Sequence, residues 1–242
     1  MKTAIVTGAS TGIGRATAIK MAEAGYHVFL VARTRARLEE TAAQISQKGG
    51  NSTICATDLG KIDQVNELIS TLLQTTESVD AIINIAGIWH GSNEVFAGRD
   101  FQTFDQEVIL DTYTVGFTAP SLLIHGLLPK MAATSKIVNL SGTFENGGKG
   151  WLPYFASKRA LEDLTVGLAQ ELADKNIQVN AVSPSDTATE SYAKYFPEYM
   201  KDAISPDRIA EKIVELCHPE NKTSGKVFVM KRGTEPVEAF HY

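Results

Sequence analysis

Short apolar runs alternate with longer amphipathic stretches along nearly the whole of this 242-residue chain. Each apolar run ends at a glycine, a proline or a polar residue, which is typical of buried parallel strands. The pattern predicts seven strands, at residues 3–7, 27–32, 52–56, 81–85, 137–141, 177–182 and 226–230.

Between these runs, apolar residues recur with the period of an α-helix. The clearest stripe runs from Leu161 to Leu172, on the helix that carries Tyr154. Further helices are expected at residues 12–24, 35–47, 63–74, 101–131 and 206–217. Pro120 lies inside the longest of them and is expected to kink or split it.

Alternating strands and helices imply right-handed crossovers and a parallel sheet that is covered on both faces. The expected fold is therefore α/β: a single Rossmann-type domain over residues 1–242, with a doubly wound parallel sheet of about seven strands. Ligands of such sheets bind past the carboxyl ends of the strands, so functional residues are expected directly after each strand.

Composition and charge argue against several classes of function. Hydrophobic residues make up 43% and charged residues 21% of the chain, as in ordinary globular proteins. A net charge of -5 argues against a nucleic-acid partner, and no apolar stretch approaches the ~20 residues of a membrane span. Cys55 and Cys217 lack metal-ligand spacing, so no metal site is expected. Sparse cysteines and the absence of a signal peptide indicate a cytoplasmic protein.

A glycine-rich turn follows the first expected strand and opens the first helix, with glycines at Gly8, Gly12 and Gly14. Such a turn lets the backbone approach a pyrophosphate, and the helix N-terminus offers N–H groups and partial positive charge. No Gly-Lys-Ser/Thr follows, so a nucleoside-triphosphate loop is excluded. The alternative is a tight strand-to-helix connection without a ligand. The expected cofactor contacts are Gly8, Ser10, Thr11, Gly12 and Ile13.

The second expected strand is followed by Arg33 rather than by an acidic residue. An acidic side chain here would bind the ribose 2′-hydroxyl of NAD, whereas a guanidinium suits a 2′-phosphate by charge and by fork geometry. We therefore expect NADP(H) to be preferred over NAD(H), through Arg33. Arg35 and Arg37 lie just beyond Arg33. Their positions can be explained equally well as exposed residues at the start of a helix, without a role in cofactor binding.

Tyr154 and Lys158 are four residues apart in an expected helix, so their side chains share one face. A phenol titrates near pH ~10, and a nearby ammonium favours the phenolate and lowers that pKa. The pair predicts a tunable proton donor, although the same spacing is common on solvated helix surfaces.

Taken together, these motifs resemble the short-chain dehydrogenase/reductase family, over residues 3–233. The resemblance rests on residues 7–14, Asp58, residues 84–87, Ser141, Tyr154 with Lys158, and Pro184, in that order. It implies an oxidoreductase that transfers hydride between a nicotinamide and a small carbonyl or alcohol substrate. Tyr154 would act as the acid and Lys158 would hold the nicotinamide ribose. It also implies a homodimer or homotetramer.

The resemblance assigns further cofactor contacts to residues that follow other strands. It places Asp58 and Leu59 near the adenine, Asn84, Ala86 and Gly87 along the adenosine ribose, and Pro184 and Thr189 beside the nicotinamide.

One departure from the family pattern lies in the expected long helix. Gly116 stands where the family has an asparagine that relays protons to the lysine. Glycine has no side chain for that purpose, so a water would have to substitute or the relay is missing. Thr112 and Thr114 are the neighbouring polar candidates.

Two other departures follow the fifth and sixth strands. The family has Asn-x-Ser-Ser, with the second serine on the substrate oxygen, whereas this chain has Ser141, Gly142 and Thr143 after Leu140. Ser141 has the customary separation from Tyr154, so we assign it that role, with Thr143 as the alternative; Ser141 could also merely end its strand. After the sixth strand, Pro184-Ser185 replaces the usual Pro-Gly.

Two functions are consistent with these residues. The first is a working NADPH-dependent carbonyl reductase or alcohol dehydrogenase that uses Ser141, Tyr154 and Lys158. The second is a weakly active or inactive family member that binds NADP(H) as a sensor or an assembly subunit. The Tyr154–Lys158 pair favours the enzyme, and Gly116 favours the binding protein.

The segment at residues 185–205 follows the sixth strand and is expected to be an irregular lid. Its aromatic residues would exclude water from an apolar or aromatic substrate, although an ordinary surface loop explains them equally well. Trp89, His90 and Trp151 are expected to line the cleft, with His90 as part of its wall rather than as a catalyst.

Overall fold

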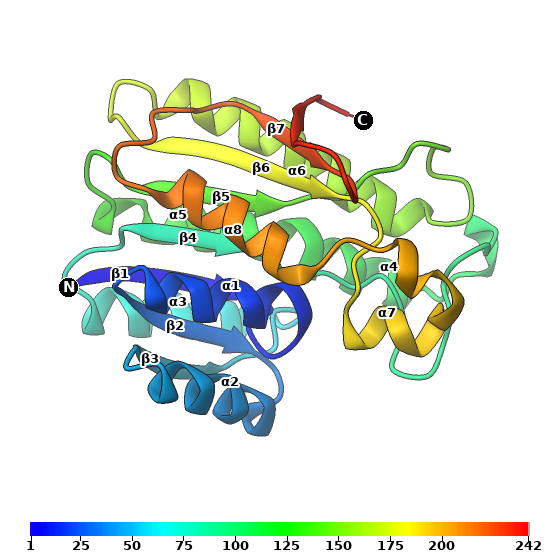
Figure 1. Ribbon diagram of the computed structural model, residues 1–242, viewed down its shortest axis with the longest axis horizontal. Helices are drawn as coiled ribbons and strands as arrows, with labels where there is room; N and C mark the ends of the chain where they lie inside the picture. The colour runs from blue at the N-terminus through cyan, green and yellow to red at the C-terminus, as the bar shows by residue number, and fades with distance from the viewer. Residues whose placement is uncertain (242) are drawn as a thin grey trace.

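An eight-stranded sheet runs through the computed structural model, which describes residues 1–241 (Figure 1). The strand order is β3-β2-β1-β4-β5-β6-β7-β8, and all neighbours are parallel except β7 and β8. The strands are β1 (Lys2–Thr7), β2 (Tyr26–Ala32), β3 (Asn51–Ala56), β4 (Ala81–Asn84), β5 (Lys136–Leu140), β6 (Gln178–Pro184), β7 (Val227–Met230) and β8 (Val237–Glu238). The order reverses between β1 and β4, which is where doubly wound sheets bind their ligands.

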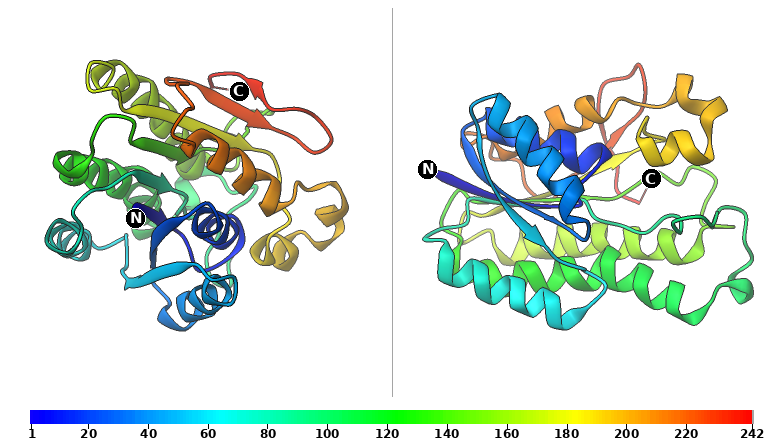
Figure 2. Two further views of the ribbon diagram at one scale, coloured as in Figure 1. Left: turned by 60° about the vertical axis from the view of Figure 1, so that its left-hand side comes forward. Right: turned by 90° about the horizontal axis from the view of Figure 1, so that it is seen from below.

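Helices cover both faces of the sheet, as the view from below in Figure 2 shows. One face carries α1 (Gly12–Glu23), α2 (Arg35–Gln47) and α8 (Pro206–Cys217), and the other carries α3 (Ile62–Thr75), α5 (Ala119–Leu127) and α6 (Leu152–Glu171). The shorter helices α4 (Gln106–Tyr113) and α7 (Glu190–Tyr195) lie toward the carboxyl ends of the strands (Figure 1).

The central strands are apolar because helices bury both of their faces. Ile5 and Val6 are adjacent in β1 and both fully buried, and they point into the two different cores. Burying such a side chain contributes about 1.5–3 kcal/mol. This packing fixes the strand ends, and therefore the loops that form the candidate site.

The seven strands expected from the sequence are confirmed, each within two residues at either end. β8 was not expected, because its two exposed residues, paired antiparallel to β7, are too short for a hydrophobic pattern. The helical region expected at residues 101–131 is divided, although the interruption lies before Pro120 rather than at it. It consists of α4, a π-helical turn at Thr114–Thr118 and α5, with a 3-10 turn at either end. Pro120 is the second residue of α5 and follows directly on the π-helical turn, and the backbone is helical through Thr118 and Ala119 before it.

The segment expected to be irregular is also more ordered than the sequence indicated. It contains α7 and a 3-10 turn at Pro197–Asp202. The Thr189 hydroxyl accepts a hydrogen bond from the Tyr192 N–H at 3.1 Å, which caps α7 at its N-terminus.

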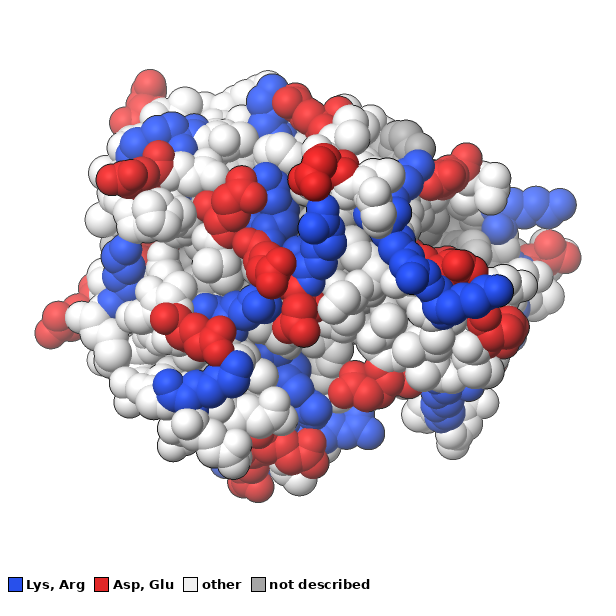
Figure 3. Space-filling view, viewed as in Figure 1, with Lys and Arg blue, Asp and Glu red and all other residues white. Residues whose placement is uncertain are grey.

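Within residues 1–241, no helix is both long and apolar enough to cross a membrane. On the face shown in Figure 3, basic and acidic side chains are interspersed rather than gathered by sign. Ion pairs such as Lys20–Glu211, at 3.2 Å, and Lys226–Glu238, at 2.6 Å, are typical of this surface chemistry.

Candidate active site

The turn between β1 and α1 requires glycine. Gly8 and Gly12 have φ angles of +70° and +51°, in the left-handed region that favours glycine. A Cβ atom on Gly14 would lie 2.0 Å from the Gly8 carbonyl oxygen. Thr11, at the N-cap of α1, makes no side-chain cap, so this helix end keeps N–H groups for an anion.

A carboxylate from the lid lies on this turn. Glu190 Oε2 accepts a hydrogen bond from the Gly12 N–H at 3.1 Å, and Glu190 Oε1 lies 3.5 Å from Arg15 Nη1. Arg15 also pairs with Glu40 at 3.0 Å. The start of α7 therefore covers the position at which an anion would approach the helix N-terminus.

The residues expected near the adenosine lie at the ends of β2 and β3. Arg33 is exposed directly after β2, and Ala32 pairs with Ala56, which brings Arg33 and Asp58 to the same edge of the sheet. Asp58 Oδ1 accepts a hydrogen bond from the Gly60 N–H at 3.0 Å, and Leu59 is buried beside it.

Asn84 is tied into the sheet rather than directed into open space. Its Nδ2 donates to Asn139 Oδ1 at 2.9 Å, and both residues are buried. The Thr7 hydroxyl accepts hydrogen bonds from the N–H groups of Ile85 and Ala86. These bonds hold the segment after β4 against the end of β1 and so fix the edge on which Ala86 lies.

Tyr154 and Lys158 lie together at the carboxyl end of β5, on the first two turns of α6. Lys158 Nζ is 5.5 Å from the centroid of the Tyr154 ring and donates to the Leu140 carbonyl at 2.7 Å. A Cβ atom on Gly87 would lie 3.2 Å from Lys158 Nζ and 3.6 Å from Tyr154 Cε2. The absence of a side chain at Gly87 thus leaves space beside both groups, of which Lys158 is buried and Tyr154 lines the cavity described below.

The pKa values of this pair are set by desolvation. Burial raises the pKa of Tyr154 to about 12. Burial lowers the pKa of Lys158 to about 8, while the Glu162 carboxylate acts in the opposite direction. The expected lowering of the Tyr154 pKa is therefore wrong, because burial disfavours the charged phenolate.

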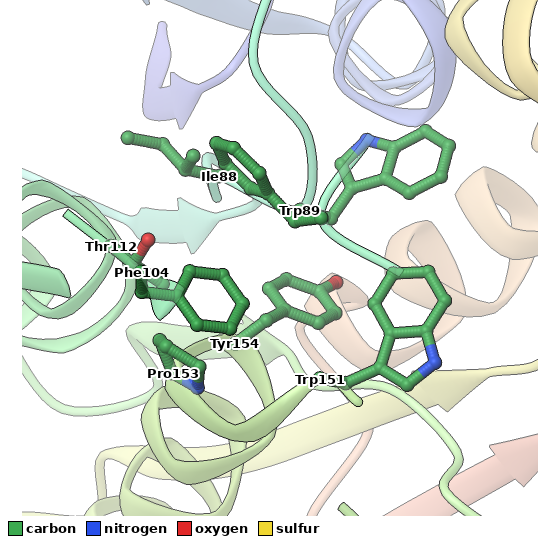
Figure 4. A pocket seen from close by; sticks show the side chains of 8 residues that line it. Ile88, Trp89, Phe104, Thr112, Trp151, Pro153 and Tyr154 are labelled. Atoms are coloured by element: carbon green, nitrogen blue, oxygen red, sulfur yellow. The ribbon is translucent and has the colours of Figure 1, made fainter. Parts of the chain in front are cut away.

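A narrow cavity opens above Tyr154, and most of its wall is aromatic (Figure 4). The space inside it that water can occupy is only about 10 Å³, and Figure 4 shows the Tyr154 ring between the rings of Phe104 and Trp151. The lining residues are Ile88, Trp89, Phe96, Phe104, Thr112, Trp151, Pro153 and Tyr154. Such a surface suits a flat apolar molecule that presents one polar group to the phenol.

The lid closes against the loop after β4. The Tyr195 hydroxyl donates to the Gly91 carbonyl at 2.6 Å, and Lys194 Nζ donates to the Ser92 carbonyl at 2.5 Å. Trp89 makes ring contacts with three lid residues, Tyr192, Tyr195 and Phe196, at centroid distances of 6.0–6.2 Å. The sequence led us to expect an aromatic lid and Trp89 in the cleft wall, and these contacts join the two.

The family model for short chain dehydrogenases matches residues 2–199. The chain belongs to this family. The match includes the glycine turn, Tyr154 and Lys158, and it identifies the protein as an oxidoreductase that acts on carbonyl or alcohol groups.

Three relatives illustrate the similarity. A fatty acyl-CoA reductase of Acinetobacter baylyi is 33% identical over 88% of this chain and 72% of its own length. An uncharacterized oxidoreductase of Staphylococcus aureus (strain USA300) is 32% identical over 94% of this chain and 96% of its own. The crystal structure of the landomycin C-6 ketoreductase LanV, with bound NADP and rabelomycin, superposes with a TM-score of 0.82, at 27% identity and 94% coverage of both chains.

In this short-chain dehydrogenase, the structure corrects the role expected for Ser141. Its side chain is 1% exposed, and its hydroxyl donates to Glu162 Oε1 at 2.5 Å, within the core under α6. A Cβ atom on the next residue, Gly142, would lie 3.9 Å from the Tyr154 hydroxyl. Gly142, which has no side chain, therefore occupies the position that faces the phenol. The alternative, Thr143, is half-buried and ties its N–H to the Pro184 carbonyl at 3.1 Å.

Gly116 lies in the π-helical turn, against α6. A Cβ atom there would lie 2.8 Å from the Ser157 hydroxyl oxygen, so the present backbone has no room for a larger residue. Thr112 lines the cavity with Tyr154, but its hydroxyl donates to the Val108 carbonyl at 2.6 Å.

Several cavity residues were not expected from the sequence, notably Ile88, Phe96 and Phe104. They stand in segments without a regular hydrophobic period, so the sequence carries no signal that separates them from loop residues. Within residues 1–241, no group of three or more His, Cys, Asp or Glu side chains forms a metal site.

Proposed function

We propose that this protein is an NADPH-dependent reductase or dehydrogenase that interconverts a carbonyl and an alcohol, with Tyr154 as the general acid or base. The observation that carries this proposal is the position of Tyr154, which lines the cavity and lies beside Lys158 and Gly87, while the neighbouring Ala86 lies against Gly8 of the glycine turn. Bound nicotinamide would supply or accept the hydride. The names of reductase relatives support the same class of reaction.

The residues present fit such a dinucleotide. The turn at Gly8 and Gly12 brings the backbone of the α1 N-terminus to where a pyrophosphate would bind, although Glu190 now occupies the Gly12 N–H, and Arg33 is exposed directly after β2. We infer that Ser10, Thr11, Ile13, Asp58, Leu59, Asn84, Ala86, Gly87, Pro184 and Thr189 complete the cofactor site. The Thr189 hydroxyl already caps α7, so Thr189 would contact the cofactor mainly through its backbone and its methyl group.

During carbonyl reduction, the Tyr154 hydroxyl would donate its proton to the substrate oxygen. The raised pKa of Tyr154 keeps that proton in place at neutral pH. The resulting phenolate would be stabilised by the ammonium of Lys158, whose pKa of about 8 leaves it mainly charged at pH 7. Glu162 would maintain that charge from the opposite side.

The test is a screen of aromatic and aliphatic ketones and aldehydes with NADPH, followed by the loss of NADPH absorbance. Turnover of at least one class is the expected result. Tight NADPH binding without any turnover would instead favour a weakly active or inactive family member, which Gly116 and the bare Gly142 position make a specific second candidate.

We further infer a cytoplasmic homodimer or homotetramer. The family resemblance implies such an oligomer, and the exposed leucines on α4 and α6, Leu110 at 64% and Leu152 at 39%, are compatible with a face shared between copies. Size exclusion with light scattering tests this inference, and a monomer would contradict it.

Replacing Arg33 by Ala is expected to lower the preference for NADPH over NADH by about tenfold, because charge-assisted hydrogen bonds to a phosphate are lost. The measurement is the ratio of kcat/KM for the two cofactors. Arg37→Ala, a few residues along in α2, is the matched control and should leave the ratio unchanged. An unaltered preference in Arg33→Ala would remove Arg33 from the site.

Replacing Glu190 by Gln is expected to tighten NADPH binding two- to fivefold, or about 0.3–1 kcal/mol, because a competing negative charge leaves the α1 N-terminus. Fluorescence titration measures this, and the gain should shrink at high salt. Glu40→Gln removes the other carboxylate on Arg15 and should not reproduce the gain. Weaker binding in Glu190→Gln would mean that Glu190 supports the site rather than competes for it.

A further inference from the structure

His90, in the loop after β4, is a half-buried imidazole whose two nitrogens have different surroundings. Its Nδ1 accepts a hydrogen bond from the Phe96 N–H at 2.8 Å. An acceptor nitrogen carries no proton, so in the neutral ring the proton lies on Nε2. Burial lowers the pKa of His90 to about 4, and the ring is therefore neutral at physiological pH.

The Nε2 atom lacks a hydrogen-bond acceptor for its N–H in the described part of the chain. It is buried, and it has no hydrogen-bond partner within residues 1–241. A buried donor without an acceptor is unfavourable, because it has lost water and gained nothing in return. This N–H is therefore free to donate to an acceptor from outside the chain.

The surroundings of His90 are almost entirely aromatic. Its ring centroid lies 4.1 Å from that of Trp89, 4.6 Å from Tyr195, 5.4 Å from Trp151, 5.6 Å from Phe196 and 6.2 Å from Phe96. Trp89, Phe96 and Trp151 also line the cavity above Tyr154 (Figure 4). The Tyr195 hydroxyl is already used on the Gly91 carbonyl.

We propose that His90 determines substrate specificity, by donating its Nε2–H to a second oxygen of an aromatic ketone whose reacting carbonyl meets Tyr154. The inference rests on the proposed reductase function and names its substrate class. Flat rings bind well between aromatic side chains, but such contacts discriminate poorly. A single donor with a fixed tautomer supplies the discrimination, since a substrate without the matching oxygen leaves that donor unpaired.

The lid is part of this site. Tyr195 and Phe196 pack on His90 from the lid, and Tyr195 and Lys194 fasten it to the loop that carries His90. The present cavity is smaller than such a substrate and His90 does not line it, so the substrate would have to displace Tyr195 and Phe196 from His90, replace their ring contacts with its own aromatic surface and bring its oxygen to Nε2. The alternative partner for Nε2–H is the face of a neighbouring ring, a weaker interaction that needs no substrate.

The experiment compares two ring-substituted tetralones of similar size, one with a methoxy group and one with an ethyl group at the same position of the aromatic ring. Both carry the reducible ketone, but only the methoxy compound offers a second acceptor. The wild type is expected to favour the methoxy compound by about tenfold in kcat/KM, the value of one hydrogen bond. His90→Phe should remove this preference by slowing only the methoxy compound, and His90→Gln, which retains an N–H donor, should restore part of it.

Binding is measured separately from turnover, by quenching of tryptophan fluorescence, because Trp89 and Trp151 contact His90. A binding preference without turnover supports the role of His90 and refutes the proposed reductase. Turnover without a methoxy preference at any tested ring position, or equal losses for both compounds in His90→Phe, refutes the role of His90 and leaves the reductase intact. Failure of the wild type to bind either compound also refutes the role of His90. The affinity of each variant for NADPH shows whether it is folded.

Discussion

Replacing Tyr154 by Phe is expected to reduce carbonyl turnover by at least about 10³-fold while NADPH affinity changes by less than about twofold. The substitution removes one hydroxyl and keeps the ring, which lines the cavity and contacts Phe144 at a centroid distance of 5.9 Å. Lys158 keeps its bond to the Leu140 carbonyl, which does not involve Tyr154. The loss should therefore appear in kcat, because only the proton transfer step is affected.

The matched control is Tyr199→Phe. Tyr199 is also a lid tyrosine, but its side chain is 54% exposed and it does not line the cavity above Tyr154. Its loss should leave kcat within about twofold. Substantial reduction by Tyr154→Phe would mean that another group, or water, protonates the substrate, and the proposed mechanism would then fail.

The strands and the glycine turn were predictable because each depends on local sequence. Buried parallel strands are short apolar runs whatever their neighbours are, and a turn that needs positive φ at Gly8 and Gly12 accepts little other than glycine. The candidate cofactor edge followed from the order of these elements, since parallel strands end on one side of the sheet.

The assignment of Ser141 failed for a reason of register. Counting back from Tyr154 assumes a fixed length for the loop before α6, but the direction of a side chain at a strand end is set by alternation along β5. Ser141 points toward Glu162, and the next residue, Gly142, faces Tyr154. Because side chains alternate between the two sides of a strand, an error of one residue assigns the position that faces the cleft to a residue that points into the core.

Other features could not be predicted because they depend on contacts distant in sequence. Glu190 reaches Gly12 across 178 residues, and no local pattern indicates that contact. Likewise, the four-residue spacing of Tyr154 and Lys158 gave their proximity but not their burial. The sign of the Tyr154 pKa change depends on burial, which only the folded structure reveals.

Gly142, which faces Tyr154, lacks the hydroxyl expected at this position. Gly142→Ser is therefore expected to raise kcat for carbonyl reduction on the order of 10²-fold. A hydroxyl here would lie beside the Tyr154 phenol and could donate to the substrate oxygen as charge develops on it. Removing one such donor from an active site commonly costs about 10²–10³ in kcat. The family resemblance places a serine hydroxyl in this role, which the buried Ser141 cannot perform.

The site has room for the change. Gly142 is not among the glycines with positive φ, so serine meets no backbone strain. Its Cβ would lie 3.6 Å from Phe144 Cε2 and 3.9 Å from the Tyr154 hydroxyl, both ordinary contacts. Gly142→Ala adds the same Cβ without the hydroxyl and serves as the control, which should give no gain. Equal gains from alanine and serine would attribute the effect to packing, and no gain from serine would show that the missing hydroxyl does not limit this enzyme.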